Sequence, residues 1–171
     1  AEQFPEGDEG FRDRLVMELL YGSGMRLSEL LGLEIADLNL KERTIRVFGK
    51  RAKERIIPIG KTLAALLQDY LTIRAPEEDT EILILTDKGK AAYPVFVQRI
   101  VKKYLTGVTT IAQKSPHVLR HTYATHLLNN GADLNAIKEL LGHSNLAATQ
   151  VYTHNSIEKL KKSHEQAHPK A

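Results

Sequence analysis

The chain has 171 residues, of which 42% are hydrophobic and 26% charged, and it contains no cysteine. This length suits one well-packed domain and is short for two. The lack of cysteine excludes disulfides and thiolate metal sites. No apolar run approaches the ~20 residues that a membrane-spanning helix needs. The composition therefore favours a soluble globular protein that works in the cytoplasm without a membrane partner.

Charge is unevenly distributed along the chain, although the net charge is only +3. Residues 1–20 hold six acidic and two basic side chains, a balance of −4. Residues 41–61 hold eight basic and two acidic side chains, a balance of +6. A basic cluster in a nearly neutral chain suggests an anionic partner such as nucleic acid. A solvated basic hairpin would explain the same pattern.

Apolar side chains recur at helical spacing in several segments. The first helices are expected over residues 11–21, from Arg26 through Leu31, and over 61–74, 94–105 and 116–130. Between the second and third of them, residues 44–59 are typical of a β-hairpin with a polar tip at 49–53. Residues 82–85 are expected to form a short buried extended segment.

Capping signals define the helices of the last third. Ser115 and Pro116 suit the N-cap and first helical position, and Gly131 suits a left-handed stop. Shorter helices are expected from Asp133 to Gly142, from Ser144 or Asn145 through Thr153, and over 156–167. The sequence therefore predicts a mainly α domain with a small antiparallel β-sheet or hairpin, in the α+β class.

His117 and Arg120 are three residues apart near the start of one predicted helix, so they share a face. The free N–H groups of the first turn and the positive end of the helix dipole lie on the same side. A phosphate bound there would meet an arginine, an imidazole and the helix end together. A salt bridge beside a surface histidine would explain the spacing as well. His121 and His126 lie outside this pair and are interpreted as structural.

A metal site is the other reading of these histidines. His117 and His121 are four residues apart, a spacing compatible with two metal ligands. No Glu follows the first histidine as the zinc-protease motif requires, and the helix offers no carboxylate as a third ligand. The sequence therefore predicts no metal site and no other cofactor.

Tyr152 lies in the segment that follows His143. A tyrosine has a pKa of ~10, so as a nucleophile it needs nearby cations or a base to accept its proton. Arg26, Arg120 and the two histidines could supply these cations and neutralise the charge that develops on a phosphorane. The alternative is a tyrosine that packs at the rim of the core.

The strings LLYGSGMRLSELLGL, SPHVLRHTYATHLLNNGADL and LLGHSNLAATQVYTH resemble the tyrosine recombinase (phage integrase) family. The likeness is strongest to the Xer-type site-specific recombinases of bacteria and covers essentially the whole chain. It implies the fold of the family's catalytic domain. It also implies six catalytic residues, which are Arg26, Lys50, His117, Arg120, His143 and Tyr152.

The resemblance gives each residue a role. Arg26, His117, Arg120 and His143 would bind the phosphate, Tyr152 would be the nucleophile, and Lys50 would protonate the 5′-hydroxyl leaving group. Glu29 would support the site from behind. Arg51, Lys53 and Arg55 are expected to bind the DNA backbone. The implied reaction cleaves and rejoins DNA through a 3′-phosphotyrosyl bond without metal or ATP, in chromosome dimer resolution.

Three related functions compete with this one. An integrase of a phage or conjugative element would share the chemistry, and so would a type IB topoisomerase. A non-catalytic DNA-binding domain of the same fold would need no Tyr152.

The resemblance also implies partners. These are a double-stranded recombination site in the bacterial nucleoid, further recombinase subunits in a cyclic tetramer, and an activating protein. Residues 1–171 are expected to form one catalytic domain without the family's N-terminal DNA-binding domain, and therefore to bind DNA weakly. Residues 156–171 are a candidate for exchange with a neighbouring subunit.

Overall fold

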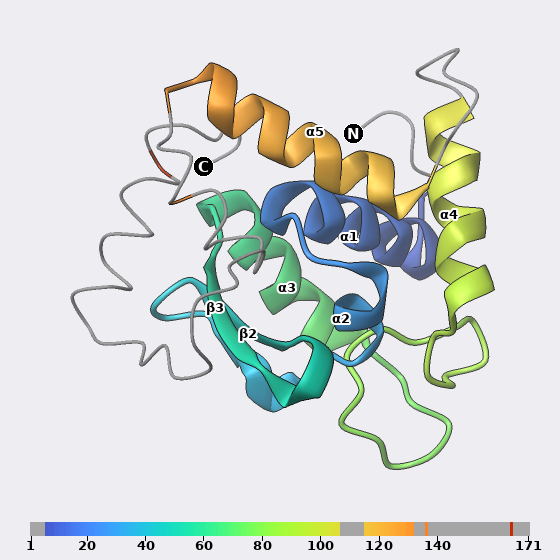
Figure 1. Cartoon of the computed structure of the whole chain (residues 1–171). Helices are drawn as coiled ribbons and strands as arrows, with labels where there is room; N and C mark the ends of the chain where they lie inside the picture. The colour runs from blue at the N-terminus through green and yellow to red at the C-terminus, as the bar shows by residue number, and fades with distance from the viewer. Residues whose placement is uncertain (1–5, 107–114, 132–135, 137–164, 166–171) are drawn as a thin grey trace.

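The structure is a computed structural model that describes residues 6–106, 115–131, 136 and 165. Helices come first, then a small sheet, then helices again (Figure 1). The elements are α1 (Asp8–Ser23), α2 (Leu27–Leu31), β1 (Leu38–Asn39), β2 (Thr44–Phe48), β3 (Glu54–Pro58), α3 (Lys61–Ile73), α4 (Pro94–Thr106) and α5 (Pro116–Asn129). Two short 3₁₀ turns add η1 (Ile35–Asp37) and η2 (Lys50–Ala52). The predicted α+β class is confirmed.

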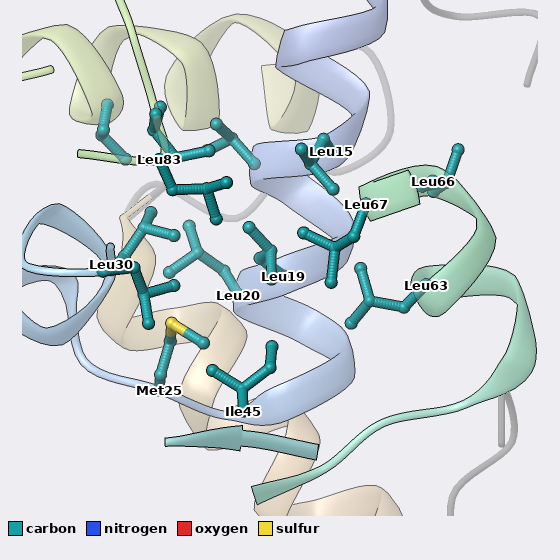
Figure 2. Packing of buried hydrophobic residues seen from close by; sticks show 14 of the residues in the cluster. Leu15, Leu19, Leu20, Met25, Leu30, Ile45, Leu63, Leu66, Leu67 and Leu83 are labelled. Carbon is teal, nitrogen blue, oxygen red and sulfur yellow. The ribbon is translucent and has the colours of Figure 1, made fainter. Parts of the chain in front are cut away.

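Helix α1 is the centre of the fold, because α3, α4 and α5 all pack against it. Leu15, Leu19 and Leu20 of α1 are completely buried. Figure 2 shows them beside leucines of α3, with Met25 and Ile45 completing the lower part of the core. Each fully buried leucine contributes roughly 1.5–3 kcal/mol through removal of apolar surface from water. This core holds the segments that carry the site in fixed positions.

The sheet is a three-stranded antiparallel meander in the order β1-β2-β3. The predicted hairpin is β2 and β3, joined through η2, whereas the two-residue β1 was not predicted. Ile45 pairs with Ile57, and Val47 pairs with Arg55. These four residues are buried, so they form the inner face of the hairpin. Residues 82–85 are largely buried as predicted, but they form isolated bridges rather than a strand of this sheet.

Helix α5 begins and ends as predicted, with one difference at its start. Ser115 occupies the N-cap position and Pro116 begins the helix, but the Ser115 side chain makes no capping hydrogen bond. Gly131 has a φ of 87°, which fits the predicted left-handed stop. Apart from residues 136 and 165, the predicted helices between Asp133 and residue 167 lie outside the described residues. Among the described helices, none is long and apolar enough to cross a membrane.

The turn between α1 and α2 depends on Gly24. Its φ of 66° is left-handed, and its N–H donates to the carbonyl of Leu20 at 3.1 Å, which ends α1. A Cβ at this position would lie 2.3 Å from the ring of Tyr123 in α5. Glycine is therefore needed here both for the backbone conformation and for the close approach of α5.

Substitution Gly24→Ala is expected to lower the free energy of unfolding by more than about 2 kcal/mol. The left-handed conformation alone costs a non-glycine residue ~1–2 kcal/mol, and the clash with Tyr123 adds to it. Gly131→Ala is the matched control, since its φ is also positive but no heavy atom lies within 4 Å of the added Cβ. Urea unfolding measures both losses. Equal losses in the two variants would contradict the packing role of Gly24.

Candidate active site

The site is built around Glu29, whose side chain is completely buried at the start of α2. Its Oε1 atom accepts a hydrogen bond from the backbone N–H of Arg26 at 2.7 Å, which caps the helix. Arg26 precedes α2 directly, and its side chain is half-buried. The capping contact fixes the backbone of Arg26 at the start of α2.

Arg120 reaches the same point from α5 and is buried. Its Nη1 atom donates to the carbonyl oxygen of Gly24 at 3.0 Å and lies 3.8 Å from Glu29 Oε1. Burial is the main cause that lowers the pKa of Arg120 to about 10, and the positive charges of Arg26 and Arg55 lower it further, against the opposing effect of Glu29. The guanidinium is therefore held where its positive charge is costly.

Arg55 does not lie on the hairpin surface, where a DNA-binding residue was expected. Its side chain is 6% exposed, and its Nη1 atom forms an ion pair with Glu29 Oε2. The cause is strand register, because Arg55 faces inward opposite Val47. The structure thus places three arginines around one carboxylate. The resemblance implied that Glu29 supports the site from behind, but not that Arg55 contacts it.

The tip of the hairpin lies next to this cluster. A Cβ added to Gly49 would lie 3.9 Å from Arg26 Nη1 and 3.6 Å from Glu29 Oε2. Lys50 follows directly and is exposed, as are Arg51 and Lys53. The Gly49 N–H donates to the Lys53 carbonyl at 2.8 Å and closes the turn. The backbone thus brings Lys50 to the site, while its side chain remains in solvent.

A cavity of about 590 Å³ opens beside the arginines, between α2, α4 and the first turns of α5. Its lining comprises Arg26, Leu27, Ser28, Gln98, Ser115, Pro116, His117, Arg120, His121 and Ala124. His117 and Arg120 therefore share one surface with Arg26, as the sequence predicted. The hydroxyl of Ser115 is buried and has no hydrogen-bond partner among the described residues.

The two histidines interpreted as structural differ from each other. His126 is structural, because its Nδ1 atom lies 2.6 Å from the Tyr21 hydroxyl and joins α5 to α1. His121 is exposed and lines the cavity one turn after His117, so it lies beside the predicted pair. The four-residue spacing of the two histidines was the available signal. Gln98, from α4, had no such signal in the sequence.

Two predicted site residues, His143 and Tyr152, lie outside the described residues. Among residues 6–106 and 115–131, no three His, Asp or Glu side chains gather in a way that could hold a metal ion. The described part of the site is a cluster of three guanidinium groups and one carboxylate. Its excess positive charge at the wall of an open cavity is suited to a phosphate group.

Inorganic phosphate is expected to stabilise the protein more than sodium chloride of equal ionic strength. Binding to the folded state at ten times the dissociation constant contributes about 1.4 kcal/mol. Arg26→Gln is expected to abolish the difference, as measured by thermal unfolding. Lys90→Gln is the control, because Lys90 pairs with Glu77 at 3.7 Å and does not line the cavity. An equal phosphate effect in Arg26→Gln would rule out this site as the anion site.

Comparison with curated proteins finds clear sequence relatives. The chain is 47% identical over 168 residues to a tyrosine recombinase XerC from Chlorobaculum tepidum, covering 94% of this chain and 50% of the relative. It is 42% identical over 168 residues to a tyrosine recombinase XerD from Staphylococcus epidermidis, covering 96% and 57%. The chain thus spans about half the length of the curated relatives that it matches.

Solved structures match the chain as well. The XerH site-specific recombinase bound to its difH substrate matches with a TM-score of 0.74 and 26% identity, over 91% of this chain and 47% of that one. The XerA recombinase matches with a TM-score of 0.71 and 29% identity, over 90% and 56%. The model of the phage integrase family matches residues 2–159. The chain belongs to the phage integrase family.

Proposed function

We propose that this chain is the catalytic part of an Xer-type site-specific DNA recombinase, which cleaves and rejoins DNA strands through a 3′-phosphotyrosyl intermediate. One observation carries the proposal. Arg26 and Arg120, from opposite ends of the described chain, meet around buried Glu29 at a cavity that His117 also lines. The names of the XerC and XerD relatives support the same activity.

In the proposed reaction, the neighbouring cations favour the phenolate of Tyr152, which releases its proton to solvent water and attacks the scissile phosphorus. The bond from phosphorus to the 5′ oxygen breaks, and a bond from phosphorus to the tyrosyl oxygen forms. Arg26 and Arg120 neutralise the charge that develops on the non-bridging oxygens, and His117 and His143 donate hydrogen bonds to them. Attack by the 5′-hydroxyl of a partner strand reverses the bond changes and joins the strands.

Lys50 is the proposed general acid, which gives its proton to the 5′ oxygen as that oxygen leaves. Two features support this role: the exposed side chain of Lys50, and the place of Gly49 against Arg26 and Glu29. The exposed neighbours Arg51 and Lys53 are proposed to bind backbone phosphates.

The partners are part of the proposal. The substrate is a double-stranded recombination site on the bacterial chromosome, so the protein would work in the cytoplasm at the nucleoid. Four recombinase subunits would form a ring on DNA, with residues 156–171 exchanged between neighbours and an activating protein to start the reaction. Chromosome dimer resolution is the proposed role. An integrase of a mobile element is the second candidate, since the family model carries that description.

A covalent adduct with DNA tests the activity. The chain is incubated with nicked duplexes that carry difH and the recombination sites of the XerC and XerD relatives. Loss of the short fragment beyond the nick prevents religation, so the adduct accumulates and is resolved on a denaturing gel. Wild type is expected to form it, and Tyr152→Phe is expected to lower the yield by at least about 10³-fold, because the substitution removes the attacking oxygen of the proposed reaction.

Tyr93→Phe is the matched control, because it removes the hydroxyl of a tyrosine that is 48% exposed and does not line the cavity. This variant is expected to form the adduct as wild type does. DNA binding without an adduct on every substrate would favour a non-catalytic DNA-binding domain. An adduct that persists in Tyr152→Phe would overturn the assignment of the nucleophile.

DNA binding by this chain alone is expected to be weak and to fall steeply with salt, because backbone contacts dominate it. A plot of the logarithm of the DNA association constant against the logarithm of the salt concentration has a negative slope. Lys53→Gln is expected to make this slope shallower by about 0.9, the value for one phosphate contact. Fluorescence anisotropy over a range of salt concentrations measures it. An unchanged slope would remove Lys53 from the interface, and tight binding at moderate salt would contradict the expected weakness.

A further inference from the structure

An exposed phenylalanine lies two residues before Lys50, on the outer face of the hairpin. Phe48 is 46% exposed, and no step of the proposed reaction uses it. We infer that the ring of Phe48 binds an unpaired nucleobase of DNA, namely the base of the nucleotide that carries the 5′-hydroxyl after cleavage. The choice of this nucleotide rests on the proposed function, whereas the binding of an unpaired base is measurable without cleavage.

The alternation of β2 turns Phe48 outward. Its neighbour Val47 is buried and faces the core, so Phe48 faces solvent on the other side of the sheet. In the ladder with β3 it lies opposite Glu54, which is exposed as well. Packing in the core therefore does not explain this ring. Because single exposed apolar side chains are common on protein surfaces, the inference depends on what surrounds Phe48.

The ring is supported by a buried carboxylate through Arg46. The Nε and Nη2 atoms of Arg46 each donate to Asp37 Oδ1 at 3.3 Å, and Asp37 is buried. These contacts hold the Arg46 guanidinium over Phe48, 5.4 Å from the centre of the ring. A side chain that is already held in place loses less conformational freedom when a ligand binds. Phe48 is therefore preorganised for a flat partner.

The charge around Phe48 favours nucleic acid over an apolar protein surface. Exposed Lys50, Arg51 and Lys53 follow it within five residues, and Glu54 is the acidic side chain beside them. Residues 41–61 as a whole have a charge balance of +6. A DNA strand supplies phosphates for such cations and flat bases for the ring, which an apolar protein surface does not.

An unpaired base is the part of DNA that fits the ring. Inside a duplex both faces of a base are covered by its neighbours, so an aromatic side chain stacks only on a base that has left the stack. The proposed reaction frees such a base, since the strand with the 5′-hydroxyl must leave for its partner. Lys50 is the proposed proton donor to that 5′ oxygen. Two residues of chain span at most about 7 Å, so Phe48 lies close to the same nucleotide.

A tryptophan at this position reports the contact directly. The chain contains no tryptophan, so Phe48→Trp introduces a single indole whose fluorescence is quenched when a base stacks on it. The probes are the duplexes of the adduct test without the nick, with one mismatched base at the cleavage point or with a nucleotide there that has no base. In the Tyr152→Phe background, quenching is expected with the mismatched duplex and not with the abasic one. Tyr93→Trp, at a tyrosine that is 48% exposed, is expected to respond to neither.

Loss of the ring is expected to weaken only the contact with unpaired DNA. Phe48→Ala should bind the mismatched duplex about 5–150-fold more weakly, the range for loss of one base–aromatic stack. Its affinity for the fully paired duplex and the salt slope should stay as in wild type, because no cation is removed. Phe48→Leu keeps an apolar side chain without a flat ring and is expected to behave like Phe48→Ala. Tyr93→Ala is the matched control and should bind both duplexes as wild type does.

Several outcomes would overturn the inference. One is equal weakening of the paired and mismatched duplexes in Phe48→Ala, and another is equal quenching of Phe48→Trp by abasic DNA. A third is self-association without DNA that Phe48→Ala abolishes in sedimentation, because the ring would then bind a second copy of the chain. Urea unfolding verifies that each variant folds, and Phe48→Leu replaces Phe48→Ala if the latter does not.

The inference and the proposed function fail in different ways. Quenching that depends on the base, with no covalent adduct on any substrate, would count against the proposed function and leave the binding of an unpaired base in place. An adduct formed by wild type, with no base-dependent quenching of Phe48→Trp, would do the reverse. Failure to bind any of the duplexes would contradict both.

Discussion

One buried carboxylate organises the described part of the site. Glu29 meets Arg26 at the start of α2, Arg55 on β3 and Arg120 on α5, so three separate segments share a single counter-charge. Each segment is also fixed by other means: Gly24 lets α5 approach, and the hairpin register turns Arg55 inward. The carboxylate therefore links α2 to β3 and to α5, and it is also the negative charge of the arginine cluster. The orientation of every arginine in the cluster depends on it.

The charge balance of this cluster has an energetic cost in the absence of a ligand. Three guanidinium groups face one carboxylate, and burial together with the two other arginines lowers the pKa of Arg120 to about 10. A phosphate at the cavity would supply the missing negative charge and relieve this repulsion. The interaction would strengthen as more negative charge develops on the phosphate oxygens. A site arranged in this way favours the transition state of phosphoryl transfer over the ground state.

The sequence predicted the features that depend on residue spacing within one segment of the chain. The helical periodicity located α1, α3, α4 and α5, and the three-residue spacing placed His117 and Arg120 on one face of a helix. The orientation of Arg55 could not be predicted, because Ile56 and Ile57 are both apolar and either alternation gives a plausible inner face. Only the pairing of Val47 with Arg55 settles it. Gln98 reaches the cavity through the packing of α4 beside α5, which spacing within one helix does not specify.

The hairpin of β2 and β3 has a base that is held by an ion pair and a tip that is exposed to solvent. Its base is tied to α2 by the ion pair of Arg55 with Glu29, and Gly49 lies against the same carboxylate. Beyond Gly49 the chain turns through Arg51, whose φ is 62°, and the side chains of Lys50, Arg51 and Lys53 are exposed. Movement of Lys50 toward a bound DNA strand would leave the ion pair at the base intact. If Arg26, Arg120 and Lys50 have the roles proposed above, the arginines would be held in place before DNA binds, and only the lysine would have to move.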